Sequence, residues 1–341
     1  MRSPHHVAAL LAALALVSAC GDSPTEVPST FEGRFEELWS RFDGTYPYFL
    51  HKSVDWNAAR AAYLPRAQAA TSQNELVDAL VEMLRELHDI HVWFVRPDGS
   101  QLSTYTSTRA RNWERNTWLE YIGRMGWRQQ SGTSWGWGRS GSVGYVTIGD
   151  WNPARVSAAG LDTALDSLRA TTSLVIDVRM NGGGNDAIAM DFAARFASRS
   201  FVTEHFRFRN GPGHGDFTAP TIRTLNPRGP WTYTAPVFVL TGRGVYSSNE
   251  SFVSAMRELP NVTIVGDTTG GATGNPSLQS LGDGWQYTVP RWFATTPDGI
   301  AIEDNGIPPD VVIRFDPAAF ERRVDVTLDS ALALARGGGV G

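Results

Sequence analysis

Apolar side chains recur at helical spacing through the first part of the chain. From Phe31 the pattern becomes helical: "FEELWSRFDGTYPYF" at 35–49 places Phe35, Leu38 and Phe42 at helical spacing, and "VDWNAARAAYL" at 54–64 follows as a second helical segment. A third helix is indicated by "SQNELVDALVEMLRELHDIH", which begins with a Ser72–Glu75 capping box. Its apolar stripe comprises Leu76, Leu80, Met83, Leu84 and Leu87. This pattern predicts a small N-terminal helical subdomain over residues 31–100.

From residue 143 onward the pattern changes to apolar strands that alternate with amphipathic helices. Three continuous apolar runs, at 173–179, 236–242 and 262–271, are each typical of a strand buried on both faces. We therefore expect an α/β core over 143–335 with a largely parallel sheet. The stretch 101–142 is rich in Trp, Arg and Ser with weak periodicity, which predicts an irregular connecting segment or short strands.

The N-terminus has the features of an export signal. Arg2 precedes an apolar run at 7–17, which is too short to span a bilayer, and small residues lead to Cys20. "VSAC" resembles a bacterial lipobox, which implies a signal peptide at 1–19, lipidation of Cys20 and a flexible tether at 20–30. Gly21 after the cysteine favours the outer membrane by the same resemblance, so we expect a lipoprotein on the periplasmic face of the envelope. An ordinary signal with a chance cysteine is the alternative.

The composition is that of a soluble globular protein and excludes some partners. Hydrophobic residues make up 42% and charged residues 19%, which allows a sizeable core. The net charge is −5 with no basic block, which argues against nucleic acid. The chain has one cysteine, Cys20, and one lysine, Lys52. No phosphate-binding loop motif is present.

Two strand ends carry candidate chemistry. "VYSSNES" at 245–251 allows Ser247 to be either a helix cap, with Glu250 completing a capping box, or a nucleophile near the positive end of a helix. "NGGG" at 181–184 is either a tight turn or an oxyanion hole, because glycines let backbone N–H groups approach a substrate closely. Ligands of such sheets bind beyond the carboxyl ends of the strands, so both stretches could share one site.

Five stretches in order then give a family resemblance. "LHDIHVWF", "DVRMNGGG", "VYSSNESF", "VGDTTGG" and "IEDNGIPPD" together resemble the C-terminal processing (tail-specific) serine peptidases, in the tricorn-core-like branch. The resemblance implies a crotonase/ClpP-like α/β core after a helical subdomain, and serine-dependent hydrolysis of peptide or protein substrates. The stretch at 101–142 is too short for the peptide-binding PDZ domain that many members carry.

The resemblance also assigns roles to individual residues. It implies that Ser247 is the nucleophile. The position of the lysine base of many members carries Ala272, which leaves a histidine, and His91 matches the base of the tricorn-like branch. Glu303 matches the orienting carboxylate. The oxyanion hole would use the amide of Gly182 or Gly183 together with that of Ser248, and the reaction needs neither metal nor cofactor.

Other interpretations of these residues stay open. His91 could be an ordinary histidine at a helix end, or could join His88 and Asp89 in binding a metal. Rival carboxylates are Asp89, Asp267 and Asp310. The branch can place a supporting serine before the histidine, whereas this chain has Ile90. On the same fold, a non-catalytic ligand- or peptide-binding protein is the main alternative function, and a hydratase acting on acyl thioesters is a further one.

Overall fold

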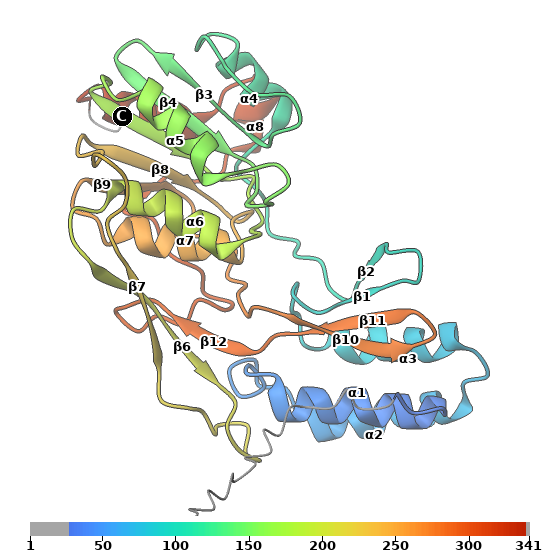
Figure 1. Ribbon diagram of the computed structural model, residues 1–341. Helices are drawn as coiled ribbons and strands as arrows, with labels where there is room; N and C mark the ends of the chain where they lie inside the picture. The colour runs from blue at the N-terminus through green and yellow to red at the C-terminus, as the bar shows by residue number, and fades with distance from the viewer. Residues whose placement is uncertain (1–26, 339–341) are drawn as a thin grey trace, which may run out of the picture.

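The computed structural model describes residues 27–338 and consists of a helical end and a sheet-containing end (Figure 1). The predicted signal peptide at 1–19 and Cys20 lie outside the described residues, as does most of the predicted tether. Among the described residues, no helix is both long enough and apolar enough to cross a membrane.

Three N-terminal helices, α1 (Phe31–Thr45), α2 (Trp56–Ala69) and α3 (Gln73–Arg85), form the predicted helical subdomain. The predicted apolar stripe of α3 is fully buried. Ser72 caps this helix, because its hydroxyl accepts a hydrogen bond from the N–H of Glu75 at 3.3 Å. The Glu75 carboxylate reaches back to the same turn: it accepts from the N–H of Thr71 at 2.7 Å and also from the backbone of Ser72, as the predicted capping box requires.

A six-stranded sheet forms the centre of the other end, and it confirms the predicted α/β class. Its order is β13 (Val311–Val312), β9 (Val262–Gly266), β8 (Val237–Thr241), β5 (Ser173–Asp177), β4 (Val143–Ile148) and β3 (Trp135–Ser140). Only β3, at one edge, is antiparallel to its neighbour. The carboxyl ends of the parallel strands therefore meet at one edge of the sheet, where a ligand site is expected.

Helices cover both faces of this sheet because successive side chains of each strand point to opposite faces. On β5, Leu174 and Ile176 join the core formed with α5 (Ala158–Ser167), α6 (Asp186–Ala193) and α7 (Ser248–Arg257). Val175 joins a smaller core on the other face, where α9 (Val326–Ala335) and the segment around Ile122 pack. A short 3₁₀ turn at Ala194–Phe196 follows α6, and α8 (Pro317–Glu321) precedes α9.

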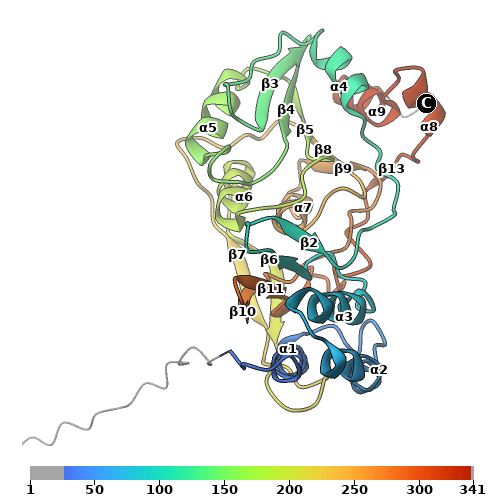
Figure 2. The ribbon, with the colours of Figure 1, turned by 90° about the vertical axis from the view of Figure 1, so that its right-hand side faces the viewer.

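Two smaller sheets connect the helical subdomain to the core (Figures 1 and 2). One contains β12 (Trp292–Thr295), β6 (Phe201–Phe208) and β7 (Thr221–Leu225). The other contains β10 (Ser277–Gly282), β11 (Trp285–Val289), β1 (Trp93–Val95) and β2 (Gln101–Ser103). Trp285, Tyr287 and Val289 of β11 are buried in the same cluster as α1–α3. The subdomain is thus completed by residues from the second half of the chain.

The segment 101–142 is more regular than its sequence pattern indicates. It contains β2 and β3, which fit the expected short strands, and also a helix, α4 (Arg115–Ile122), that was not predicted. Glu114 caps this helix with bonds from the N–H groups of Asn116 and Thr117. An N-terminal cap by glutamate is a weaker sequence signal than one by Ser, Thr, Asp or Asn, which explains why the helix was missed.

Candidate active site

Ser247 lies at the turn between β8 and α7 in an unusual backbone conformation. Its φ is 58° and its ψ is −134°, a region that residues other than glycine rarely adopt. The Ser247 side chain makes no capping hydrogen bond to α7. Its backbone N–H donates to the carbonyl of Ala272 at 2.8 Å. The alternative that Ser247 is an ordinary helix cap is therefore wrong, and its hydroxyl is left for another role.

Glu250 does not reach back to Ser247 as a capping box would require. Its carboxylate accepts from the hydroxyl of Thr269 at 2.5 Å and from the N–H groups of Gly271 and Ala272 at 2.9 and 2.8 Å. Burial raises the pKa of Glu250 to about 8, even though these three bonds act in the opposite direction. Glu250 thus ties the first turn of α7 to the loop that also binds the backbone of Ser247.

The glycine loop after β5 lies directly against Ser247. A Cβ atom at Gly183 would lie 2.7 Å from Cβ and 3.3 Å from Oγ of Ser247, and Gly183 has a φ of +109°. Only glycine fits this close approach without displacing the serine. The loop selected from the sequence therefore lies in contact with Ser247.

The N–H groups of this loop differ in their partners. That of Gly183 donates to Oδ1 of Asn181 at 2.8 Å. Those of Gly182 and Ser248 have no hydrogen-bond partner within residues 27–338. The Ser248 hydroxyl is also buried without a partner in the described part of the chain. The two free amides are the donors that an anionic oxygen could use without displacing an existing bond.

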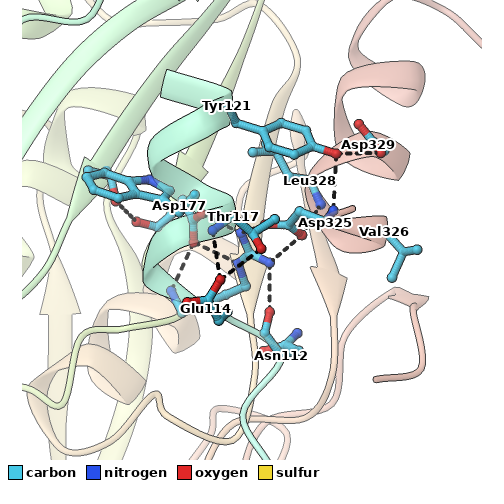
Figure 3. A network of polar contacts seen from close by, with 12 residues as sticks. Asn112, Glu114, Thr117, Tyr121, Asp177, Asp325, Val326, Leu328 and Asp329 are labelled. Carbon is cyan, nitrogen blue, oxygen red and sulfur yellow. Dashed lines mark hydrogen bonds and ion pairs between the residues drawn. The ribbon is translucent and has the colours of Figure 1, made fainter. Parts of the chain in front are cut away.

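A buried arginine anchors the strand end that leads into this loop. Arg179 bonds both carboxylate oxygens of Asp177, at 2.9 and 2.7 Å, and both of Asp325, at 2.8 and 2.7 Å. It also donates to the carbonyl of Asn112 at 2.8 Å. Figure 3 shows this network, which joins β5, the segment before α4 and the N-terminus of α9. These bonds fix the position of the backbone that leads into the glycine loop.

A cavity of about 300 Å³ opens beside Ser247. Its wall is mostly polar and combines the N-terminus of α6, the first turn of α7 and the loop after Ala272. The residues around it are Gly184, Asn185, Asp186, Ala187, Ser247, Ser248, Ser251, Thr273, Gly274, Asn275, Pro276 and Trp292. Its volume is enough for one side chain of a ligand bound beside Ser247.

His91 lies in the turn between α3 and β1 and is almost completely buried. Asp89 Oδ1 accepts its backbone N–H at 2.7 Å and lies 3.9 Å from its Nδ1, too far for a hydrogen bond to the ring. Nδ1 has no hydrogen-bond partner in the described chain. Burial lowers the pKa of His91, while the nearby Asp89 charge raises it and Lys52 lowers it further. A neutral imidazole is thus favoured, as a general base requires.

Glu303 lies buried between the core and the helical subdomain. Its Oε1 is 2.8 Å from Nζ of Lys52, and its Oε2 accepts the N–H of Thr273 at 2.9 Å. Burial and the charge of Asp89 raise the pKa of Glu303 well above its usual range, against the opposing effect of Lys52. Thr273 directly follows Ala272, whose carbonyl binds Ser247, so one short loop contacts both predicted site residues.

The structure brings the three predicted residues to one region without bonding them to each other. Within residues 27–338, no hydrogen bond or ion pair joins Ser247 to His91, or His91 to Glu303. Their chain neighbours do meet, since a small cavity of about 40 Å³ is lined by Ile90, Tyr246 and Glu303 among others. Catalytic contacts are often long in the absence of substrate and shorten when it binds.

Sequence reasoning missed several residues of this region. The sequence assigns no role to Lys52, which pairs with Glu303, and the predicted oxyanion-hole residues do not include Gly184, which lines the cavity. Asp89 was named only as a rival carboxylate or metal ligand, and Tyr46, which donates to its Oδ2 at 2.9 Å, was not considered. No spacing pattern marks Lys52 or Tyr46, because their partners are distant in sequence. No three His, Cys, Asp or Glu side chains of the described residues are grouped so as to hold a metal ion.

Comparison with known families and proteins gives consistent matches. The model of peptidase family S41 matches residues 142–313, which is half of the chain, and that of the tricorn protease C1 domain matches residues 28–85. The tricorn protease of Thermoplasma volcanium is 26% identical over 199 residues, covering 57% of this chain and 17% of that protein. The carboxy-terminal processing protease CtpB of Bacillus subtilis is 28% identical over 175 residues, covering 51% of this chain and 34% of that protein.

This chain therefore spans about a third or less of the length of these two relatives. A crystal structure of a proposed peptidase from Parabacteroides merdae matches along nearly its whole length. It superposes with a TM-score of 0.80 and 28% identity, covering 90% of this chain and 97% of that one.

Proposed function

The chain belongs to peptidase family S41, and we propose that it is a serine peptidase that hydrolyses peptide bonds with Ser247 as nucleophile. The observation that carries this proposal is the conformation of Ser247. Ser247 has a positive φ at the start of a helix, yet its hydroxyl makes no capping hydrogen bond. This hydroxyl lies beside a glycine loop and a cavity, so the strained conformation has no evident structural purpose. Strain of this kind is stored at functional sites.

The proposed reaction begins when the Ser247 Oγ attacks the carbonyl carbon of the scissile bond. His91 takes the proton of the hydroxyl as the C–O bond forms, and the carbonyl oxygen becomes an oxyanion. Collapse of the tetrahedral intermediate breaks the C–N bond, and the proton on His91 goes to the leaving amine. Water, activated by the same imidazole, then hydrolyses the acyl-enzyme and restores the serine.

The oxyanion would be stabilised by the amide of Ser248 together with an amide of the loop Gly182–Gly183. The amide of Gly182 is free to do so, whereas that of Gly183 would first have to leave Asn181. We assign Glu303 as the carboxylate that supports the imidazolium formed on His91. Asp89 contributes negative charge nearby, but its oxygens are already bound to the His91 backbone and to Tyr46.

Ser247→Ala tests the nucleophile directly. Loss of the nucleophile from a working triad costs on the order of a million-fold in turnover, so hydrolysis of a casein or peptide-library substrate should vanish while the melting curve is retained. A fluorophosphonate probe should modify the wild-type protein at Ser247, as located by mass spectrometry. Ser330→Ala, which removes a half-buried hydroxyl of α9 that donates to the carbonyl of Val326, is the matched control. Undiminished hydrolysis by Ser247→Ala would refute the assignment.

His91→Ala tests the base in the same assay. General base catalysis contributes about 10²- to 10⁴-fold, so turnover should fall by at least this much. Probe labelling of Ser247 should slow in parallel, because the probe needs the same activated hydroxyl. Full activity of this variant would reassign the base.

We also propose that the protein is an exported lipoprotein anchored through Cys20 on the periplasmic face of the cell envelope. This location is supported by the sequence of residues 1–20, in which a basic residue is followed by an apolar run and then by small residues before Cys20. Labelling with a radioactive fatty acid in a bacterial host should mark the wild-type protein and not Cys20→Ser. An unlabelled wild-type protein would exclude the anchor and leave the peptidase assignment untouched.

A further inference from the structure

The single lysine of the chain forms a buried ion pair with the proposed catalytic carboxylate. Lys52 follows α1 in a turn of the helical subdomain, and its ammonium lies 2.8 Å from Oε1 of Glu303 and 2.7 Å from Oδ1 of Asp304. Only 5% of its side chain and 2% of that of Glu303 are exposed. Such a pair is screened little by solvent, so its effect on Glu303 is large.

Lys52 is not placed to act as a base. Burial alone would lower the pKa of its ammonium, but the charges of Glu303 and Asp89 outweigh burial and raise that pKa. A protonated lysine has three donors and no acceptor, so it cannot take the proton of Ser247. Its function must lie in the charge that it supplies.

The groups that face Glu303 make this charge necessary. Two buried carboxylates, Asp89 and Glu303, lie in the same region with two buried tyrosines, Tyr46 and Tyr48, whose pKa values burial raises and which therefore stay neutral. Other charged or titratable groups lie in the same region: His51, whose Nε2 lies 3.0 Å from the Glu303 carbonyl; Asp304, which also pairs with Lys52; Arg109, which donates to the Asp304 carbonyl; His88, which lines the cavity of about 40 Å³ together with Glu303; and His91, on which the charge of Lys52 also acts. Of these, only the cation of Lys52 touches the Glu303 carboxylate.

We propose that Lys52 is a positioning residue that fixes the Glu303 carboxylate against the loop at Thr273 and supplies the positive charge that favours its ionised form. This inference rests on the proposed function, because Glu303 matters to the reaction only if His91 is the base. Without Lys52, Glu303 would keep its proton to higher pH, because a buried carboxyl beside Asp89 disfavours a second negative charge. A neutral carboxyl would support the imidazolium of His91 poorly.

The first experiment compares pH profiles of kcat/KM for wild type, Lys52→Met and Lys52→Arg. For Lys52→Met we expect the acid limb to move to higher pH. Each unit by which the Glu303 pKa then exceeds the assay pH lowers the ionised fraction of Glu303 tenfold. We therefore expect kcat/KM to fall at least about tenfold at pH 7, and this loss should become smaller toward pH 9. Lys52→Arg keeps the charge and should keep most of the activity and the wild-type profile. A uniform loss in Lys52→Met without a shift would overturn the proposal, because a merely structural role gives that result.

A double variant and a surface pair act as controls. The charge of Lys52 also lowers the His91 pKa, so the control must show that the shift of the acid limb depends on Glu303. In the Glu303→Gln background, Lys52→Met should therefore move the acid limb much less. An equal shift in that background would also overturn the proposal. Arg60→Met removes an exposed pair with Glu36 from the same subdomain, and it should change neither kcat nor the profile.

A spectroscopic test does not depend on catalysis. Because Lys52 is the only lysine, labelling with ¹⁵Nζ-lysine gives a single side-chain signal whose titration can be followed in the full chain. The ammonium of the wild type should stay protonated above the ordinary lysine pKa of about 10.4, and in Glu303→Gln it should lose its proton at lower pH. An ordinary titration in both proteins overturns the proposal even if Lys52→Met does not fold. The proposed function fails in a different way. In that case the wild-type protein would hydrolyse no peptide and Ser247 would not react with the fluorophosphonate probe, although the shifted titration of Lys52 would still be observed.

Discussion

Arg179 and Asp325 form a two-bonded ion pair that is completely shielded from water, with N–O distances of 2.8 and 2.7 Å. The first residue lies between the end of β5 and the glycine loop, and the second caps the N-terminus of α9. Because Arg179 also pairs with Asp177, its guanidinium is held from both sides (Figure 3). The C-terminal helix therefore takes part in positioning the loop beside Ser247.

Asp325→Ala should destabilise the whole core. Removing one partner of a buried ion pair costs about 3–5 kcal/mol, and we expect the lower end, about 3 kcal/mol, because Arg179 retains Asp177. Urea unfolding followed by tryptophan fluorescence gives this free energy. Asp329→Ala removes an exposed carboxylate of α9 that bonds only the hydroxyl of Tyr121, and it is the matched control. Equal stability of the two variants would show that the pair contributes nothing.

The elements that the sequence predicted correctly are those whose burial is periodic and whose contacts are local. The helices α1 to α3 and the strands β5, β8 and β9 were all expected at or near their observed positions. The hairpins β6–β7 and β10–β11 were not, because β6 and β10 are only partly buried and have no continuous apolar run. A second obstacle is pairing between strands that are remote in sequence: β1 pairs with β11, so that Phe94 lies opposite Tyr287. No local pattern can encode such a pairing.

The candidate site shows the same limit. The motif stretches located Ser247, His91 and Glu303, but the Ser247–Glu250 capping box was wrong for two reasons. A capping residue normally has extended φ and ψ, whereas Ser247 has positive φ. Glu250 also has better donors in the loop 269–272. The sequence assigns no role to Lys52, because this residue is distant from Glu303 in the chain. The fold brings its ammonium into an ion pair with the Glu303 carboxylate.

Gly183→Ala should abolish most of the activity. The new methyl group would lie 2.7 Å from Cβ of Ser247, and an L-residue at a φ of +109° is strained by at least about 1–2 kcal/mol. A displacement of the nucleophile by about 1 Å can cost about 10²-fold, so we expect at least this loss in kcat with a moderate loss of stability. Gly44→Ala, in α1, has open space around its Cβ and serves as the control for the assay. Wild-type turnover in Gly183→Ala would show that the loop does not set the position of Ser247.

His91 and Glu303 should together set the acid limb of the pH profile. The imidazole must be neutral to accept a proton, and burial lowers the His91 pKa, so the part of the limb that His91 sets should lie below its ordinary pKa of about 6.5. Asp89→Asn removes a charge that raises the His91 pKa, so the acid limb should move to still lower pH. His214→Gln alters a histidine that contacts Asp43 and should leave the profile unchanged. A limb that moves upward in Asp89→Asn would contradict the assignment of His91 as the titrating base.

Glu204 should make the protein less stable as the pH rises from about 5 to about 8. It is buried behind the cavity, where its carboxyl accepts bonds from Ser251 and Arg223, and burial raises its pKa to about 7. The folded protein therefore holds a proton on Glu204 that the unfolded chain, with an ordinary glutamate pKa of about 4.3, releases earlier. Between these two values the folded state binds more protons than the unfolded state, so the free energy of unfolding falls with increasing pH, by on the order of 3 kcal/mol in all.

In Glu204→Gln the site is neutral at every pH, and the difference in unfolding free energy between wild type and variant should shrink or reverse from pH 5 to pH 8. His91 contributes a slope of opposite sign, because its pKa is lowered, but it is present in both proteins and cancels in this difference. Glu321→Gln changes an exposed carboxyl and should leave the wild-type slope intact. Parallel pH dependences of wild type and Glu204→Gln in urea unfolding would show that Glu204 is ionised in the folded protein throughout this range.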